Sequence, residues 1–151
     1  MNEITERSVL PPSTPACIDL IDRVCEQVKR APQIDLVTHH VLHGGIYSRT
    51  ISLEPGVVLT GTLVKVPTTL VISGAATVLF GDGEEAVVRG YLVLAASARR
   101  KQAFITHDVT HITMSFRTDA KTVEEAESEF TDEADALMSR TGRNIVVVTG
   151  E

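Results

Sequence analysis

The sequence is poor in aromatic residues. It contains no Trp, and aromatic side chains make up 4% of its 151 residues. A surface that binds single-stranded nucleic acid stacks the bases on aromatic side chains, so the composition argues against this class of protein. The net charge of −6 would also repel phosphate backbones, and we expect no nucleic-acid partner. Because apolar residues still make up 43% of the chain, a core filled mainly by Val, Ile, Leu and Ala is expected.

Long apolar runs and paired cysteines are missing as well. No apolar run approaches the length of a membrane-spanning helix, so no membrane partner is expected. The amino terminus, MNEITERSVLPPSTP, lacks the apolar stretch of a signal peptide, which predicts a protein that is not secreted. Cys17 and Cys25 are the only cysteines, and their spacing on one predicted helix is too wide for them to bridge each other. Two reduced thiols are therefore expected.

The centre of the chain, from Tyr47 to Phe80, consists of short β-branched runs interrupted by Pro and Gly. Such runs fit a pleated, half-buried surface, and the interruptions predict turns before any strand grows long. Turns are expected at Ser73-Gly74 and, as a hairpin, at Gly81-Asp82-Gly83. Many short strands with regular turns predict a mainly β fold, a sandwich or a barrel. The predicted strands cover residues 34–41, 46–53, 57–66, 69–72, 76–80, 86–88, 91–95, 102–107 and 110–117.

Helical patterns flank this β region. Residues 15–31 begin with Pro and carry apolar side chains at steps of three and four, which predicts an amphipathic helix after a flexible arm at residues 1–14. The β-barrel, residues 34–118, is followed at 119–151 by an acidic helical segment and a Val-rich tail, with one domain in all. Thr122 and Glu125 form a capping box where the acidic segment begins, as one helix or two. The tail should add a strand to a sheet of its own chain or of a neighbour, through the consecutive residues Ile145, Val146, Val147 and Val148.

The stretch GIYSRTISLEPGVVLTGTLVKVPTTLVISGAATVLFGDGEEAVVRGYLVL resembles the small cupin-fold (RmlC-like jelly-roll) proteins that tailed phages and prophages encode. Those proteins also carry a Gly-Leu/Ile-Tyr-x-Arg opening, a Pro-Gly turn, a Leu-Thr-Gly step and a Gly-turn hairpin. The His107-Asp108 pair and the acidic helix after the last strand extend the likeness to about residues 39 to 137. The resemblance implies a double-stranded β-helix, that is, a small cupin-like jelly-roll barrel, which dimerises through its sheets.

The first metal motif of the resembling family is replaced in this sequence. Metal-binding cupins place two His and a Glu just before the Gly-turn hairpin, whereas residues 64–68 here read Val-Lys-Val-Pro-Thr. In the second motif, only His107 has a plausible counterpart. Because a catalytic metal usually needs three protein ligands, we expect no metal and no cofactor. A metal site that combines His39 or His43 with His107 across strands is the weaker alternative.

Other side chains suggest a binding surface more than a catalytic centre. Two interpretations are open for Tyr47, Arg49, Lys65 and Tyr91: they line the mouth of the barrel and bind a small molecule, or they are surface or interface residues of the strands. The basic cluster Arg99-Arg100-Lys101 is expected to be a solvated turn. The Glu residues of the acidic segment are expected to form a solvated face. No nucleophile elbow or phosphate-binding loop occurs, and no catalytic residue is predicted.

Two functions are open at this stage. The resemblance and the replaced metal motif favour a non-enzymatic phage structural or accessory protein, such as a capsid decoration or another virion component. Its expected partners are further copies of itself, as a dimer or higher oligomer, and phage capsid or other virion proteins. Its expected location is the virion or the host cytoplasm. The alternative is a cupin-type enzyme or small-molecule-binding protein that uses the barrel interior, with His107, Lys65 or Tyr47 at the mouth.

Overall fold

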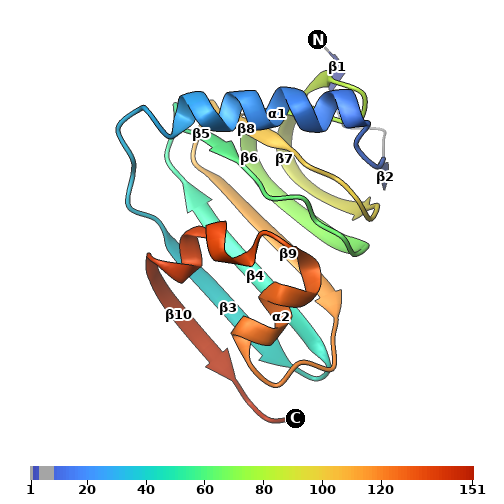
Figure 1. Ribbon diagram of the computed structural model, residues 1–151, viewed down its shortest axis with the longest axis vertical. Helices are drawn as coiled ribbons and strands as arrows, with labels where there is room; N and C mark the ends of the chain where they lie inside the picture. The colour runs from blue at the N-terminus through green and yellow to red at the C-terminus, as the bar shows by residue number, and fades with distance from the viewer. Residues whose placement is uncertain (1, 4–8) are drawn as a thin grey trace.

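Ten strands form one sheet in the computed structural model, which describes residues 2–3 and 9–151. The order along the sheet is β1-β7-β6-β9-β4-β3-β10; β2 also pairs with β7, and β8 pairs with both β6 and β5. Helix α1 crosses one end of the sheet, and the shorter α2 lies over β4 and β9 with two 3-10 turns, η1 and η2 (Figure 1). The elements are β1 (Asn2–Glu3), β2 (Val9–Leu10), α1 (Pro15–Val28), β3 (Val37–His43), β4 (Ile46–Leu53), β5 (Val58–Thr60), β6 (Thr68–Phe80), β7 (Glu84–Ala96), β8 (Ala103–Thr106), β9 (Thr110–Arg117), α2 (Val123–Phe130), η1 (Ala134–Ala136), η2 (Met138–Arg140) and β10 (Arg143–Val148).

The β6–β7 hairpin bends and thereby turns the sheet into a barrel. Its strands have 13 residues each, and Gly74 pairs with Gly90 at the bend, both with positive φ. Before Gly74, β6 pairs with β9; after it, β6 pairs with β8. A Cβ on Gly74 would lie 2.5 Å from the carbonyl oxygen of Val109, so only glycine fits this close approach. The mainly β jelly-roll fold is confirmed, but the predicted turn at Ser73-Gly74 is wrong, because these residues bend a continuous strand.

The N-terminal helix begins where the sequence predicts and ends early. The side chain of Thr14 caps it by accepting a hydrogen bond from the Cys17 backbone N–H at 3.2 Å, and Pro15 opens it. The helix ends at Val28, three residues before the predicted end at 31. Cys17 and Ile21 are buried against Ala103 of β8, so α1 packs on the barrel. Within the described residues, no helix has the length and apolar character needed to span a membrane.

The segment predicted as a flexible arm contributes to the barrel where the structure describes it. Leu10 is buried, and β1 and β2 both pair in parallel with β7. The backbone N–H of Ser13 donates to the carbonyl of Arg99. Residues 2–3 and 9–14 are therefore held by the barrel rather than free, while residues 1 and 4–8 of the predicted arm lie outside the described residues. The predicted strand at 57–66 is also shorter, since β5 ends at Thr60 and only an isolated bridge joins Val64 to Arg100.

The C-terminal segment packs over the open face of the barrel and then returns to the sheet. Thr122 caps α2 by accepting a hydrogen bond from the Glu125 N–H, which confirms the Thr122 half of the predicted capping box. The Glu125 side chain reaches back one residue further and accepts from the backbone N–H of Lys121. The segment continues as two 3-10 turns, so it contains one α-helix and not two. Strand β10 then pairs in parallel with β3 of the same chain, from Arg143 opposite Val37 to Val148 opposite Leu42. The tail thus adds to its own sheet.

The core is largely aliphatic, with one aromatic group beneath α2. Tyr47 of β4, Phe116 of β9 and Phe130 of α2 contact one another, with ring centroids 5.6 to 6.4 Å apart. Such edge and offset contacts add to the free energy gained by burying the rings. Half of the chain's six Phe and Tyr residues thus lie where the C-terminal segment covers the barrel.

Candidate functional site: the barrel cavity

A cavity of about 170 Å³ lies inside the barrel, between the sheet and the C-terminal segment. Alternation along the strands points apolar side chains into it, and Leu137 and Phe130 cover it from the C-terminal segment. Ala136 and Met138 also line it and are exposed, so the cavity reaches the surface beside the 3-10 turns. The apolar wall from the strands consists of Ile51, Leu59, Leu70, Phe104, Ile112 and Met114.

One charged side chain in the cavity wall, Arg49 of β4, is neutralised within the chain. Its Nη1 lies 2.8 Å from Oε2 of Glu127, whose side chain is 2% exposed. The other oxygen of Glu127 accepts a hydrogen bond from Nε of Arg140 at 2.8 Å, and the Ser139 hydroxyl also donates to the carboxylate. Burial alone would raise the pKa of Glu127, but the hydrogen bonds from Ser139, Arg140 and Arg49 outweigh it and hold the pKa below its usual value. The predicted solvated acidic face is therefore wrong for Glu127, which α2 turns inward.

The second charged side chain in the wall, Arg100, has no such partner. It is 2% exposed and donates to the carbonyl of Ser97 at 2.8 Å, to the hydroxyl of Thr68 at 2.6 Å and, at 3.4 Å, to Oε1 of Gln102. None of these acceptors is charged, and no carboxylate among the described residues forms an ion pair with Arg100. Burial lowers the pKa of the guanidinium to about 10, which leaves it protonated at neutral pH.

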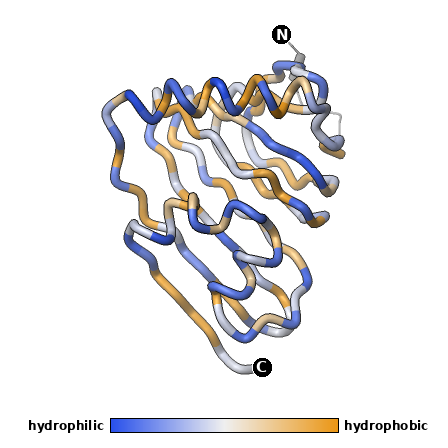
Figure 2. The backbone as a smooth tube through the Cα atoms, in the orientation of Figure 1, coloured by the Kyte–Doolittle hydropathy of each residue, from blue (hydrophilic) through white to orange (hydrophobic). Residues whose placement is uncertain are grey.

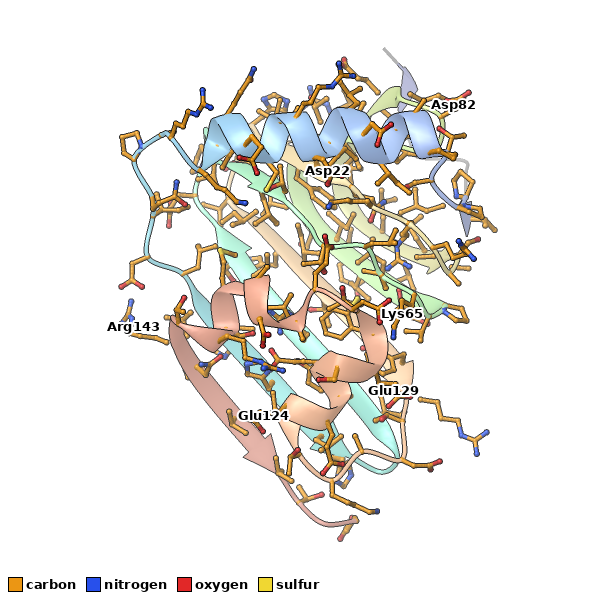
Figure 3. All side chains as sticks on the ribbon, viewed as in Figure 1. Asp22, Lys65, Asp82, Glu124, Glu129 and Arg143 are labelled. Carbon is orange, nitrogen blue, oxygen red and sulfur yellow. The ribbon has the colours of Figure 1, made fainter. Side chains whose placement is uncertain are left out.

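The expectation that Arg99-Arg100-Lys101 forms a solvated turn is wrong for two of its three residues. Arg99 is exposed and adopts a positive φ, which turns the chain so that the two following side chains point inward. Nζ of Lys101 is buried between Asp22 of α1, at 2.5 Å, and Glu133, at 3.5 Å. Burial alone would lower the pKa of Lys101, but these two carboxylates outweigh it and raise the pKa. Figure 3 shows Asp22 on the side of α1 that faces the barrel.

Gln102 adds an unpaired donor to the same wall. Its Nε2 is buried and has no hydrogen-bond partner, the one such side-chain N or O atom in the part of the chain that the structure describes. Exchanging the positions of Oε1 and Nε2 by an amide flip would not pair Nε2. Nε of Arg100 can only donate, and Oε1 is the only acceptor in the amide. The wall therefore presents an uncompensated guanidinium and a free amide N–H₂ side by side.

A buried histidine that the sequence did not single out joins β3, β4 and β10. His40 lies 2.7 Å from the Tyr47 hydroxyl through Nδ1 and 2.7 Å from Oδ1 of Asn144 through Nε2. Asn144 donates to the Ser139 carbonyl, which directs its oxygen at the ring, so Nε2 carries the proton and Tyr47 donates to Nδ1. Burial lowers the pKa of His40 and raises that of Tyr47 to about 12. The alternation that puts His39 outside and His40 inside was the only sequence signal for this residue.

The weak metal candidates do not come together. His39 is exposed on β3, and His43 at its end hydrogen-bonds Thr149 at 2.7 Å. His107 is exposed in the turn after β8 and hydrogen-bonds Thr77 at 2.6 Å. In residues 2–3 and 9–151, no three His, Cys, Asp or Glu side chains are grouped so that they could hold a metal ion.

The four candidates for the barrel mouth lie in different places. Tyr47 is fully buried in the core, and only Arg49 of the four lines the cavity. Lys65 is exposed and pairs with Asp132 at 2.7 Å. Tyr91 is 70% exposed on the outer face of β7. Arg100 and Gln102, which sequence reasoning assigned to a solvated turn and a closing strand, line the cavity instead.

No protein-family model matches the chain, and no curated protein matches it. Among solved structures, it is similar to a cupin superfamily protein from Desulfitobacterium hafniense, with 14% identity over 59% of this chain and 83% of the other, and a TM-score of 0.48. A Cupin 2 conserved barrel domain protein from Salinispora arenicola shows 13% identity over 66% and 91%, with a TM-score of 0.45. A DMSP lyase from Ruegeria pomeroyi shows 12% identity over 76% and 79%, with a TM-score of 0.40.

The names of these neighbours include cupin proteins and an enzyme. Their identities are low and their TM-scores lie below 0.5, so no activity, ligand or partner of this chain follows from them. Nothing in the comparisons bears on the expected phage or prophage origin, which stays a prediction.

Proposed function

We propose that the protein is a non-enzymatic structural subunit that assembles with copies of itself. We further propose that the assembly belongs to a larger particle, as a capsid decoration or another phage virion component. The observation that supports self-assembly is the edge position and exposed apolar surface of strand β10. It is the last strand of the sheet, and its four consecutive apolar residues, 145–148, are each between 47% and 52% exposed. Figure 2 shows this segment as a continuous hydrophobic stretch at the sheet edge.

The outer edge of β10 has the properties of a pairing surface. On one side the strand is bonded to β3; on the other, within the described residues, its backbone groups face no strand. Val146 and Val148 face a groove beneath α2, so by alternation Ile145 and Val147 point to the opposite face. Val41 of β3, opposite Val147, extends this apolar strip and is also exposed. An exposed, apolar edge strand of this kind is a template for pairing with another chain.

A second copy of the chain fits this edge by symmetry. Two β10 strands related by a two-fold axis would pair antiparallel, each presenting the same apolar surface to the other. The only charge in the strand, Arg143, lies at its beginning, so the two Arg143 side chains would be at opposite ends of the pair. Arg143 already pairs with Asp35 at 3.1 Å and extends from the outer edge of the sheet (Figure 3).

Self-assembly is tested by light scattering and sedimentation of the full chain at increasing concentration. We expect a dimer or larger species, and we expect Ile145→Lys with Val147→Lys to convert it to monomer, because charges on an edge strand oppose pairing. The matched control is Tyr91→Lys with Val93→Lys, two equally spaced exposed residues of β7, which should leave assembly unchanged. A wild-type chain that stays monomeric at high concentration, or a β10 variant that assembles normally, would overturn the proposal.

The place in a virion is supported by the sequence resemblance and needs its own experiment. Particles purified after induction of a prophage that encodes this chain should contain it in a fixed ratio to the major capsid protein. If the chain assembles in solution but is absent from purified particles, the virion proposal fails and self-assembly stands.

A further inference from the structure

The barrel cavity contains two guanidinium groups in opposite electrostatic situations. Arg49 has the carboxylate of Glu127 at 2.8 Å, whereas the acceptors around Arg100 are all neutral. Both side chains line the same cavity of about 170 Å³. Among the described residues, one buried positive charge is thus left without a counter-ion, next to a space bounded mainly by apolar side chains.

A buried charge of this kind is costly unless an opposite charge reaches it. Arginine cannot relieve the cost by losing its proton at neutral pH. In the part of the chain that the structure describes, three of the five N–H groups of Arg100 have acceptors, and Nε2 of Gln102 beside it has none. The remaining donors are of the kind that binds a carboxylate, which accepts hydrogen bonds on both of its oxygens.

We propose that this cavity binds a small apolar carboxylate, with its charged group held by Arg100 and Nε2 of Gln102 and its apolar part packed against Leu59, Phe104, Ile112 and Met114. An apolar cavity of about 150 Å³ can hold benzene. The ligand is therefore of about the size of benzoate or of a fatty acid of roughly six carbons. Its tail would point toward the surface beside Met138, which is partly exposed.

The walls distinguish this ligand from a more polar anion. Phosphate or sulfate would bring four oxygens into a space where, among the described lining residues, Arg100, Gln102 and Thr60 to Thr62 are the only ones with polar groups not already paired with Glu127. The oxygens left without donors would oppose binding. A neutral amide of the same shape would fill the apolar space but leave the charge of Arg100 uncompensated.

The test is calorimetric titration of the full chain with sodium benzoate and sodium hexanoate, alongside benzamide and inorganic phosphate. We expect both carboxylates to bind at least about tenfold more tightly than benzamide or phosphate, since a charge-assisted hydrogen bond contributes a factor of that order. Absence of measurable binding by both carboxylates, or equal binding of benzamide, would overturn the inference.

Three variants locate the binding group. Gln102→Glu places a carboxylate of the chain next to Arg100 and should weaken benzoate binding by about tenfold or more, as should Arg100→Met. The matched control, Arg99→Met, removes the neighbouring exposed charge and should leave the affinity unchanged. If Arg100→Met does not fold, as judged by circular dichroism, the benzoate affinity of Gln102→Glu decides whether the carboxylate binds beside Arg100. Unchanged affinity in Gln102→Glu refutes the site, and neither result depends on assembly through β10.

Discussion

Arg49 and Arg100 line the same cavity, yet of the two only Arg49 pairs with a carboxylate among the described residues. The C-terminal segment brings Glu127, Ser139 and Arg140 to Arg49, whereas β6 and the loop before β8 bring only neutral oxygens to Arg100. The first site is a closed network whose members depend on one another. At the second site, Arg100 has no charged partner among the described residues, so replacing Arg100 leaves no charge unpaired. The difference predicts that the first site contributes to stability and that the second is available for binding.

The largest effect is expected from breaking the closed network at its centre. Glu127→Gln leaves Arg49 and Arg140 facing a neutral amide in a buried position, and we expect the free energy of unfolding to fall by about 3 to 5 kcal/mol. Urea denaturation followed by circular dichroism measures this. The control is Glu124→Gln, an exposed acid one turn earlier in α2, with an expected loss below about 1 kcal/mol. Equal losses in the two variants would mean that the network is not stabilising.

The difference between Arg49 and Arg100 is tested directly by replacing each arginine in turn. Arg49→Met takes one charged partner from Glu127 while Arg140 remains, and a loss of about 2 kcal/mol is expected. Arg100→Met removes a buried charge whose acceptors are neutral, so we expect a loss of about 1 kcal/mol or less. The same denaturation experiment ranks the two. If Arg100→Met is the more destabilising, Arg100 has a structural role that its neutral contacts do not account for.

Acid should weaken the protein in two pH ranges. The pKa of buried His40 is lowered from 6.5, so the unfolded chain binds the proton more readily. His40 therefore contributes stability above pH 6.5 that is lost as the pH falls from 6.5 toward the lowered pKa. The pKa of Glu127 is lowered from 4.5, so its contribution is present above 4.5 and is lost below it. In His40→Gln, the slope of unfolding free energy against pH just below 6.5 should disappear, while the slope below 4.5 remains.

The smallest effect is expected at the unpaired amide. Gln102→Met removes a buried donor that has no acceptor among the described residues, together with the long 3.4 Å contact from Nε of Arg100 to Oε1, and keeps a side chain of similar length. In the absence of ligand, we expect the free energy of unfolding to stay equal or to rise by up to about 1 kcal/mol. A thermal melt compared with wild type is sufficient to measure it. A clear loss of stability would show that the contact of Oε1 with Arg100 outweighs the cost of burying the unpaired Nε2.

Much of the fold could be predicted because local patterns and tertiary structure agree. Thr14 with Pro15 marks the start of α1, Thr122 with Glu125 marks the start of α2, and β-branched runs mark the strands. Gly74 is the instructive failure. A glycine beside Ser is typical of a turn, but here it lets β6 approach the backbone of Val109 closely. A Cβ at this position would lie 2.5 Å from the Val109 carbonyl oxygen, and Val109 is far along the chain.

The candidate site could be predicted far less well. Arg100, Gln102 and Glu127 are polar residues in polar stretches, and the ordinary expectation for each is a solvated surface. Their burial depends on the turn at Arg99, on the path of β8 and on the docking of α2, none of which leaves a periodic signal. His40 was one of several histidines, and only pairing with Tyr47 and Asn144 separates it from exposed His39.

By itself, the sequence determined which segments are strands and helices and that an apolar, mainly aliphatic barrel would form, because these depend on residue type and spacing within short windows. Only the tertiary structure decided which charges are neutralised. Whether a guanidinium finds a carboxylate depends on where segments 78 residues apart, such as those of Arg49 and Glu127, come to lie. That is also why Arg100, buried without such a partner, could be recognised only in the folded chain.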